Sequence, residues 1–331
     1  AHESAGRKPA LRFRVDIDAP VQVHDVVRGT VDFPPDTMHD FVLLRSDGRP
    51  TYNFGVVVDD IAMAITHVIR GAGHLSNTPR QVLLFDAFDA PVPVFAHVPT
   101  VLDPERRKLS KRTGAQALAD YRAQGYHPDA LVNYLSLLSW SSPSGEEVLT
   151  PAQLSEQITL ERIGAADVIF DPVKLRWLSG KHIAAMPASE LARAARPFLP
   201  DALPIAEELL PEALAGVRTH LETFCDAAPQ LQTLLPPAST AAASADGMPV
   251  LRAARDVLAT VDWDADALTQ AVREAGKRAG AKGRALYEPL RVALTGVEHG
   301  PALTAVLRVQ GRERVLAALD TALDHGNRID A

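Results

Sequence analysis

A short strand, a basic loop and a helix follow one another near the middle of this chain, and this order limits the folds open to it. Residues 93–99 lie between two prolines and predict a short buried strand. Residues 115–124, closed by Gly125, predict a helix. The loop between them ends in Lys-Leu-Ser-Lys-Arg at residues 108–112. Most short basic runs are solvated loops, but flexible lysines suit a polyphosphate, so the loop is a candidate ATP site.

The composition indicates a globular chain. Of its 331 residues, 47% are hydrophobic and 23% are charged, which allows two or three domains with cores of their own. No apolar stretch is long enough to span a bilayer, and the chain does not open on a signal peptide. We therefore expect a cytoplasmic protein without a membrane partner. The single cysteine, Cys225, excludes a multi-cysteine zinc cluster, and we expect it to be a small buried hydrophobe.

Basic side chains gather in two places although the net charge is -7. That net charge argues against a general nucleic-acid coat, but a local basic face would be enough for a single RNA partner. One cluster is the lysine loop. The other lies near the C-terminal end and could equally be an ordinary solvated helix face; its members are Arg273, Lys277, Arg278, Lys282 and Arg284.

The first third of the chain has the pattern of an α/β layer. Residues 11–15 and 41–44 predict strands separated by turns, and the valines at residues 56–58 predict another strand. A helix is predicted from Thr78 to Phe88, with Thr78 as its cap and Pro79 in its first turn. Because helices and strands alternate here, we expect a parallel sheet.

The rest of the chain is predicted to be helical. Thr150 to Gln153 fits a capping box, and residues 171–172 (Asp-Pro) predict the start of the helix that carries Trp177. An apolar stripe after Pro128 predicts a buried helix face, formed by Leu131, Val132, Leu135 and Leu138. Residues 236–247 are rich in proline, alanine and serine and predict a flexible or weakly helical linker.

The basic loop resembles the second signature of class I aminoacyl-tRNA synthetases, usually Lys-Met-Ser-Lys-Ser, in the Lys-Leu-Ser-Lys-Arg form of bacterial glutamyl-tRNA synthetases. The likeness continues over nearly the whole chain. It includes residues 40–48, 50–54, 57–60, 66–71 (Thr-His-Val-Ile-Arg-Gly), 74–81 (His-Leu-Ser-Asn-Thr-Pro-Arg-Gln), 125–131, 174–178, 289–296 and 299–301.

This resemblance implies an α/β fold followed by an all-α region. Residues 1–50 would be the remainder of the inserted acceptor-binding domain, and 51–115 the second half of the Rossmann catalytic domain. Residues 116–187 would form the stem-contact domain, and 188–331 the α-helical anticodon-binding region, in two subdomains joined near 236–247.

The resemblance also implies a function for seven residues. Lys108, Ser110 and Lys111 would be catalytic, with Lys111 meeting the departing phosphates of ATP. Val101 and His74 would lie near the nucleotide, although His74 could also be a capping or core histidine. Tyr52 and Arg70 would contact glutamate, because a guanidinium pairs a carboxylate bidentately and discriminates against the amide of glutamine. Judged from the residues alone, Tyr52 could instead be a core tyrosine and Arg70 part of a salt bridge at a strand end.

The expected ligands follow from the same resemblance. They are L-glutamate, tRNA(Glu), and ATP with Mg²⁺; we expect no protein-bound zinc, no DNA partner and a monomer. Asp59 and Asp60 are better explained as turn or cap residues than as metal ligands.

The sequence departs from the family pattern in two ways. The 331 residues contain no His-x-Gly-His motif, the first ATP signature of the family, so we expect about the first third of a typical relative to be missing and residues 56–58 to form an exposed edge strand. Ala72 and Gly73 stand where relatives usually carry two acidic residues. Losing them could weaken the placement of the nucleotide or of water.

Two functions remain open on this reading. The chain could be the C-terminal two-thirds of a glutamate–tRNA ligase, inactive by itself, or a non-catalytic tRNA-binding protein of the same descent. Arg70 and a helical C-terminal region disfavour the glutaminyl enzyme. Residues 190–331 disfavour the tRNA-modifying paralogue, which lacks an anticodon domain.

Overall fold

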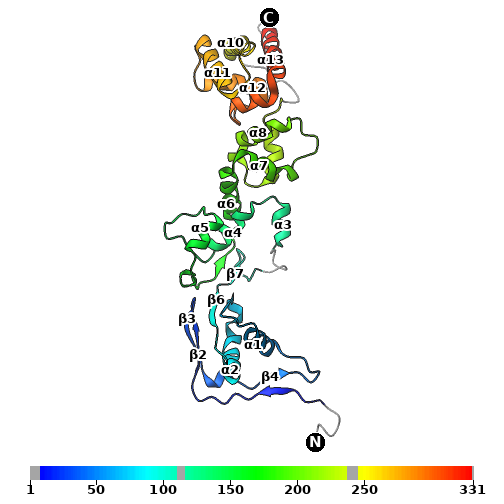
Figure 1. The fold of residues 1–331 in the computed structure, drawn as a ribbon. Coiled ribbons are helices and arrows are strands. Elements are labelled where there is room, and N and C mark those ends of the chain that lie inside the picture. The colour runs from blue at the N-terminus through cyan, green and yellow to red at the C-terminus, as the bar shows by residue number, and fades with distance from the viewer. Residues whose placement is uncertain (1–7, 110–115, 237–244, 330–331) are drawn as a thin grey trace. The chain divides into compact units, whose positions relative to one another are not determined.

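The computed structural model describes residues 8–109, 116–236 and 245–329, drawn in colour in Figure 1. The chain forms two compact units. The first comprises residues 1–115 and 132–172, and the second comprises residues 116–131 and 173–331. Within the described residues, no helix is both long and apolar enough to cross a membrane.

A four-stranded sheet carries the first unit. Its strands lie in the order β3-β2-β6-β5, with β2 at Val21–Asp25, β3 at Gly29–Phe33, β5 at His67–Gly71 and β6 at Val94–Val98. β2 and β3 form an antiparallel hairpin, whereas β5 is parallel to β6 and pairs Arg70 with His97. β2 is also parallel to β6 and meets it at Asp25 and Phe95. The parallel layer and the buried strand predicted at residues 93–99 are confirmed.

Two further strands lie near the N-terminal end of the described chain. β1 (Leu11–Phe13) pairs antiparallel with β4 (Phe41–Leu44), and the rings of Phe13 and Phe41 stack with their centroids 5.2 Å apart. Both strands agree with the sequence prediction. Aromatic pairs of this kind across a ladder stabilise short strands that would otherwise be marginal.

Helix α1 (Tyr52–Ala62) occupies the segment in which a strand was predicted at residues 56–58, so that prediction is wrong. Three successive valines favour a strand locally. However, Phe54, Val57 and Ile61 recur at the spacing of one helix face, and this face packs into the core of the first unit. The two edge strands of the sheet are β3 and β5 instead.

The same helix corrects a second prediction. Asp59 and Asp60 are neither turn nor cap residues, because both lie within α1, whose C-cap is Met63. The carbonyl oxygen of Asp59 accepts the N–H of Met63 at 2.9 Å.

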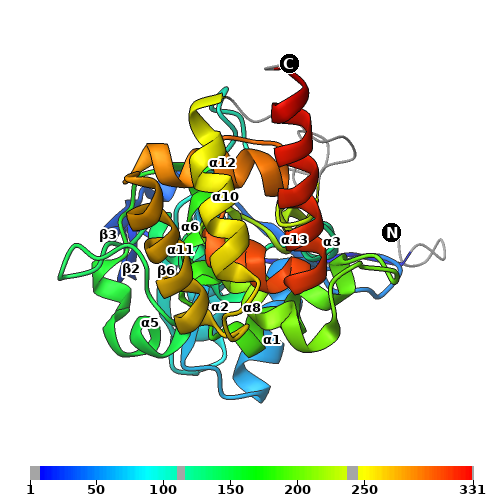
Figure 2. The same ribbon diagram turned by 90° about the horizontal axis from the view of Figure 1, so that it is seen from above.

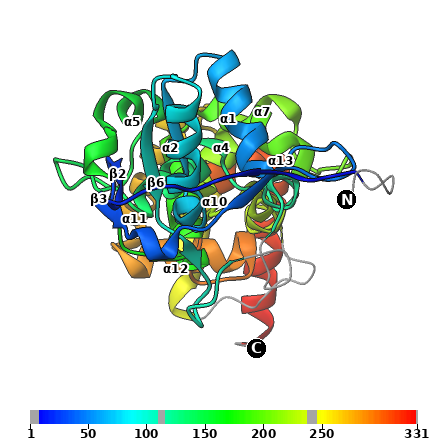
Figure 3. The ribbon, with the colours of Figure 1, turned by 90° about the horizontal axis from the view of Figure 1, so that it is seen from below.

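Helix α2 (Thr78–Ala87) begins at the predicted residue, with Pro79 in its first turn. The predicted cap is wrong, because the N-cap is Asn77 and Thr78 is already helical. The hydroxyl of Thr78 is turned toward the carbonyl oxygen of His74, at 3.2 Å. Seen from below, α1 and α2 lie side by side (Figure 3).

The remaining part of the first unit is mostly helical. Its elements are the second half of α4 (Pro128–Leu137), α5 (Pro151–Gln157), and a short parallel pair of β7 (Val101–Leu102) and β8 (Val168–Ile169). The capping box before α5 is confirmed: Thr150 Oγ1 accepts the N–H of Gln153, and Gln153 Oε1 accepts the N–H of Thr150.

The predicted buried stripe after Pro128 is wrong at two of its four residues, whereas Leu131 and Leu138 are half-buried. Val132 and Leu135 are 48% and 51% exposed. The buried positions are Ala130, Asn133 and Tyr134, so the buried face is turned by about one residue. The buried amide of Asn133 explains this choice, because its Oδ1 accepts the N–H of Leu149 at 3.0 Å and ties the helix to the following loop.

The second unit is wholly helical in the described residues. Its first group is α3 (Leu118–Ala123), α6 (Pro172–Ala185), α7 (Ala188–Ala195), α8 (Leu210–Val217) and α9 (Ala227–Gln232). α6 begins after Asp171, as predicted. α3 begins later than the predicted residue 115, because Asp120 accepts the N–H of Ala117 at 2.7 Å and closes the first turn there.

Cys225 is exposed, which corrects its predicted burial. It lies in a short 3₁₀ helix at Phe224–Asp226, and the neighbouring Phe224 takes the buried position. Gly125, at φ +74°, lies against this turn: a Cβ atom there would come within 2.7 Å of the backbone nitrogen of Cys225. A glycine is therefore required at the end of α3.

The C-terminal group of helices is α10 (Met248–Leu258), α11 (Ala265–Ala279), α12 (Arg284–Thr295) and α13 (Leu303–Ile329). α10 lies between α11 and α13 (Figure 2), and Gly311, at φ +76°, breaks α13 into two parts. Of the linker predicted at residues 236–247, residues 237–244 lie outside the described residues, and Ala245–Gly247 forms a 3₁₀ turn.

Candidate active site

The carboxyl ends of parallel strands β5 and β6 meet at one edge of the sheet, where open α/β sheets usually bind ligands. A cavity of about 340 Å³ lies there. Three of the residues predicted from the sequence, His74, Val101 and Lys108, line it. The other lining residues come from the ends of β5 and β6 and the segments that follow them: Gly71, Ala72, Gly73, Pro99, Thr100 and Leu109.

Arg70 directly precedes Gly71, which lines this cavity. Three hydrogen bonds hold the side chain of Arg70. Its Nε donates to Nε2 of His97 at 3.1 Å. Its Nη2 donates to Oγ1 of Thr78 at 2.9 Å and to Oε1 of Gln81 at 2.7 Å. These bonds use Nε and Nη2 of a guanidinium that has five N–H groups. Nη1 is not a donor in any of the three.

The charge of Arg70 is only partly solvated. Burial lowers the pKa of this guanidinium, whereas Tyr52 and Asp60 act in the opposite direction. Burial also raises the pKa of Asp60, and Arg70 opposes that rise. None of the ion pairs among the described residues includes Arg70, so the salt bridge considered from the sequence is not found there. A partly desolvated cation in this setting is suited to an anionic ligand.

Tyr52 lies close to Arg70, and His74 lies close to Tyr52. The hydroxyl of Tyr52 is 3.5 Å from Nδ1 of His74, and the ring centroids are 5.7 Å apart. Tyr52 is 52% exposed, so it is not the core tyrosine considered from the sequence. The structure thus brings Tyr52, Arg70 and His74 together from α1, β5 and the 3₁₀ helix at Ala72–Asn77.

A tight turn presents Lys108. The carboxylate of Asp103 accepts the backbone N–H of Arg107 at 2.8 Å and its Nε at 2.9 Å. Burial opposes ionisation of Asp103, but these bonds and the charge of Arg107 lower its pKa overall. Arg106 sits at φ +62°, a conformation that costs a residue with a side chain about 1–2 kcal/mol. The backbone of Lys108 then forms an antiparallel bridge with that of Leu102 across the turn.

This turn revises the basic cluster predicted from the sequence. Arg107 also contacts Glu105, at 3.1 Å, so its charge is matched by two carboxylates of the turn itself. Ser110 and Lys111, and with them the predicted phosphate contact, lie outside the described residues. The carbonyl oxygen of Val101, a residue predicted to lie near the nucleotide, accepts the N–H of Leu109 at 2.9 Å.

The glycine at position 73 faces the turn lysine. A Cβ atom at Gly73 would have Nζ of Lys108 as its nearest neighbour, at 3.9 Å, and would meet no clash. We expect Gly73→Asp to place a carboxylate beside Lys108 and to stabilise the unit by about 0.2–1 kcal/mol. A double-mutant cycle with Lys108→Met, measured by urea unfolding at low and high salt, checks this; Gly73→Asn is the uncharged control. A coupling energy of zero at low salt would contradict the pairing.

Sequence reasoning missed the residues that hold Arg70. His97 and Asp25 are both fully buried, and Nδ1 of His97 lies 2.6 Å from Oδ2 of Asp25. Gln81, which accepts from Arg70, donates through Nε2 to Oδ1 of Asn53 at 3.0 Å. A signal was present: a histidine within an apolar strand predicted to be buried must have polar partners. The identity of those partners depends on the register of β5, β6 and α2.

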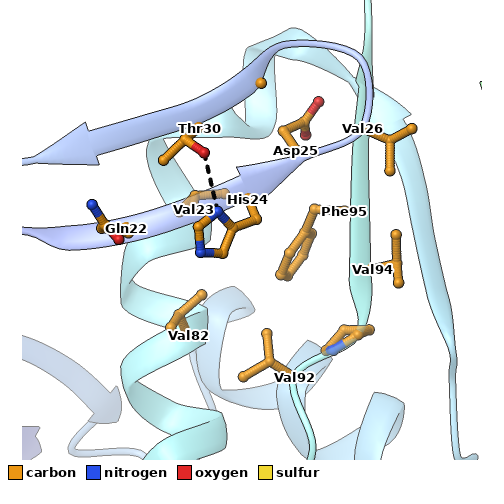
Figure 4. A pocket seen from close by; sticks show the side chains of 12 residues that line it. Gln22, Val23, His24, Asp25, Val26, Thr30, Val82, Val92, Val94 and Phe95 are labelled. Atoms are coloured by element: carbon orange, nitrogen blue, oxygen red, sulfur yellow. Dashed lines mark hydrogen bonds between the residues drawn. The ribbon is translucent and has the colours of Figure 1, made fainter. Parts of the chain in front are cut away.

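Another hollow in this unit, of about 510 Å³, lies between β2, β3, β6 and α2. Figure 4 shows the ring of Phe95 with Val82 and Val92 around it, and the bond between His24 and Thr30 beside it. The only charged group in its lining is Asp25, whose carboxylate is bonded to N–H groups. This mostly apolar lining does not suit a phosphate or a carboxylate. The described residues also contain no cluster of three metal-binding side chains.

The second basic cluster forms an exposed face. All five of its members are exposed, on α11, on the segment that leads into α12 and on the first residue of α12. Arg278 pairs with Glu274 at 3.2 Å, and Arg284 pairs with Glu288 and Glu298. The face is therefore basic, but part of its charge is matched by neighbouring carboxylates.

Three buried or half-buried histidines should make stability depend on pH. Burial lowers the pKa of His97, His127 and His182 from the usual value of 6.5. His127 and His182 stack with centroids 5.5 Å apart, and Nδ1 of His127 accepts the N–H of Asp129. The unfolded chain thus binds protons near pH 6.5 that the folded chain resists, so stability is complete above that pH and falls as the pH drops.

We expect the free energy of unfolding to be lower at pH 5.5 than at pH 7.5, measured by urea denaturation. The carboxylates with lowered pKa act only below about pH 4.5 and do not affect this window. His182→Phe should flatten the dependence for the second unit. Equal stability at the two pH values would show that these histidines titrate normally.

Two parts of the chain match known protein families. Residues 1–177 match the family described as tRNA synthetases class I (E and Q), catalytic domain. Residues 190–323 match the family described as anticodon binding domain. The sequence analysis predicted this helical anticodon-binding region, which the tRNA-modifying paralogue lacks.

The similar proteins found by these comparisons are named as glutamate–tRNA ligases. The chain is 38% identical to the glutamate–tRNA ligase of Symbiobacterium thermophilum over 96% of its own length and 69% of that protein. It is 40% identical to that of an Acidovorax species over 95% of its length and 69% of the relative. A crystal structure of a glutamate tRNA ligase from Elizabethkingia meningosepticum, in complex with its amino acid, has the same fold. Its TM-score is 0.83 at 24% identity, over 97% of this chain and 69% of that one.

The predicted family and fold class are therefore confirmed, and the chain belongs to the class I tRNA synthetases for glutamate and glutamine, among the glutamate–tRNA ligases.

Proposed function

We propose that the carboxyl ends of β5 and β6 bind L-glutamate for its ATP-dependent transfer to tRNA(Glu). The observation that carries this proposal is Arg70, a half-buried guanidinium fixed through Nε and Nη2 with Tyr52 beside it. A guanidinium fixed in this way can present its remaining N–H groups to the side-chain carboxylate of glutamate. The amide of glutamine offers the same position an N–H₂ group and no charge, which disfavours it.

The nucleotide belongs, in this proposal, to the adjoining cavity. His74, Val101 and Lys108 line it, and Lys111 would follow the phosphates of ATP with its Mg²⁺. Lys108 and Ser110 would order the loop. A positively charged loop at the mouth of such a cavity stabilises charge that builds on the leaving pyrophosphate, which is the main contribution a protein makes to this chemistry.

We assign tRNA binding to the rest of the chain. Residues 1–50 are proposed to be the remainder of the acceptor-binding domain, 51–115 the catalytic half-domain, 116–187 the stem-contact domain and 188–331 the anticodon-binding region. The exposed basic face formed by Arg273, Lys277 and their neighbours supports contact with a phosphate backbone. We also propose that the protein is a monomer and that it acts in the cytoplasm.

We further propose that residues 1–331 alone bind tRNA without charging it, because they contain no His-x-Gly-His segment to grip ATP from the other side. The test measures charging of tRNA(Glu) with labelled glutamate beside filter binding of the same tRNA. Binding with no charging is the expected result, and measurable charging would overturn the proposal.

The alternative is a non-catalytic tRNA-binding protein. It predicts tRNA binding but no affinity for glutamate. Titration of the purified chain with L-glutamate and, separately, with L-glutamine distinguishes the two functions. Selective binding of glutamate supports the ligase site, whereas equal indifference to both amino acids supports the alternative. An in-frame His-x-Gly-His motif in the gene upstream of Ala1 would be independent support for the ligase.

A further inference from the structure

Asp25 and His97 form a buried pair whose bonding is defined on every side. The Asp25 carboxylate accepts N–H groups from Val27 and Arg28 at Oδ1, at 3.0 and 2.9 Å. Its Oδ2 accepts the backbone N–H of His97 at 2.9 Å and faces Nδ1 of His97 at 2.6 Å. Both side chains are fully buried. Both carboxylate oxygens thus face N–H donors, so Asp25 acts here as an acceptor.

The bonding fixes the tautomer of His97. Because Asp25 can only accept, Nδ1 of His97 must carry a proton. On the other side of the ring, Nε2 lies 3.1 Å from Nε of Arg70, which can only donate. It also lies 3.1 Å from Oγ1 of Thr78, which accepts from Nη2 of Arg70 and donates to the carbonyl oxygen of His74. Nε2 must therefore offer a lone pair, so the ring is neutral with its proton on Nδ1. Burial and the charges of Arg70 and Arg28 also oppose a second proton, while Asp25 favours it.

We propose that Asp25 and His97 are positioning residues for Arg70: Asp25 sets the tautomer of His97, and the lone pair on Nε2 of His97 then fixes the rotation of the guanidinium. Gln81 and Thr78 hold Nη2, so the two sets of bonds leave one orientation for Nη1. The proposal rests on the proposed function only where it adds that this orientation is the one that reads glutamate. A guanidinium fixed in this way loses little freedom when it binds a carboxylate.

Asp25→Asn should reverse the tautomer. The backbone N–H groups of Val27 and Arg28 would take the amide oxygen, since turning the N–H₂ group toward them would oppose two fixed donors. The opposite orientation opposes one, the backbone N–H of His97, which keeps an acceptor at the Oδ1 position, 3.2 Å away. The N–H₂ group then faces Nδ1 of His97, which must become an acceptor and move the ring proton to Nε2. That proton points at Nε–H of Arg70, and the bond that orients the guanidinium is lost.

Two substitutions of His97 separate its bond to Asp25 from its bond to Arg70. His97→Gln can place a carbonyl oxygen near the position of Nε2 and accept from Arg70. His97→Asn can place an N–H₂ group near the position of Nδ1 and donate to Asp25, but it offers Arg70 nothing. The two variants both lose the ring, so a difference between them reports the bond to Arg70 rather than the loss of packing.

The experiment is side-chain NMR on the 331-residue chain, with ¹⁵N-labelled histidine and arginine. In the unsubstituted protein we expect the ring nitrogens of His97 to report the Nδ1–H tautomer and the Nε–H of Arg70 to exchange slowly with water. Asp25→Asn and His97→Asn should speed that exchange, and His97→Gln should preserve slow exchange. An Nε2–H tautomer in the unsubstituted protein, or equal exchange in the two His97 variants, would overturn the proposal, even if Asp25→Asn failed to fold.

Titration with L-glutamate on the same samples tests the link to the proposed function. Asp25→Asn and His97→Asn should weaken glutamate binding by about 10- to 100-fold, as supporting residues commonly do, and His97→Gln should weaken it less. If the unsubstituted protein bound no glutamate while Arg70 still responded to the variants as expected, the proposed function would fail and the positioning role would stand. If glutamate bound equally well to all four proteins, the positioning role would be refuted.

Discussion

Replacing Arg70 with leucine should weaken glutamate binding by at least about 100-fold, which corresponds to about 3 kcal/mol. Removing one partner of a desolvated charge pair typically costs about 2–5 kcal/mol, because the other charge remains buried without compensation. Here the substrate carboxylate would lose its guanidinium. His97 and Gln81 would also lose the donor that they now accept from.

Isothermal titration of the purified chain with L-glutamate measures this effect. Arg80→Leu is a matched control, because Arg80 lies in α2 next to Gln81, and its one hydrogen bond among the described residues goes to the backbone oxygen of Ser76, at 3.3 Å. Its glutamate affinity should be unchanged. Thermal unfolding of both variants separates loss of binding from loss of fold. If Arg70→Leu kept its affinity for glutamate, Arg70 would have no role in the pocket.

Replacing Lys111 with alanine should lower the rate of ATP–pyrophosphate exchange by about 100-fold or more while leaving glutamate affinity nearly unchanged. Charge-stabilising groups aimed at the atoms that gain charge commonly contribute about 10²–10³ in rate. Arg70, which we assign to glutamate, is held by bonds that do not involve the lysine loop. Under the proposed function, binding of glutamate and departure of pyrophosphate would therefore depend on different cations.

The exchange reaction must be followed in an enzyme form that carries it out, with tRNA and ATP at saturation. Lys111→Arg is the informative control: it keeps the charge on a wider and less adaptable group, so its rate should lie between those of the unsubstituted enzyme and Lys111→Ala. An exchange rate in Lys111→Ala equal to that of the unsubstituted enzyme would remove Lys111 from the reaction.

Local sequence signals predicted the structure where they agreed with the packing. The start of α2 at Thr78, the capping box at Thr150 and the strand at residues 93–99 were all read correctly, because short-range chemistry decides them. Residues 56–58 were misread because the β preference of valine is weaker than the burial of a helix face built on Phe54, Val57 and Ile61. On α4, the buried amide of Asn133 outweighed the apolar stripe.

The candidate site shows the same division. Arg70, Tyr52 and His74 were predicted individually, and the structure places them together, but their roles stay predictions. His97 and Asp25 could not be assigned from the sequence, because 72 residues separate them and only the sheet brings them into contact. Arg107 was counted as part of a basic cluster, although Asp103 and Glu105 within the same turn match its charge.

Arg70 pairs with His97 across β5 and β6, so the proposed reading of glutamate by Arg70 would depend on the alignment of these two strands. Because successive side chains of a strand point to opposite faces, a slip of one residue would turn Arg70 away from His97. Adding or removing a single residue within β6 should therefore cost substrate selectivity as well as stability. Under the proposed function, a change of length within these two strands would therefore alter the amino-acid preference and the fold together.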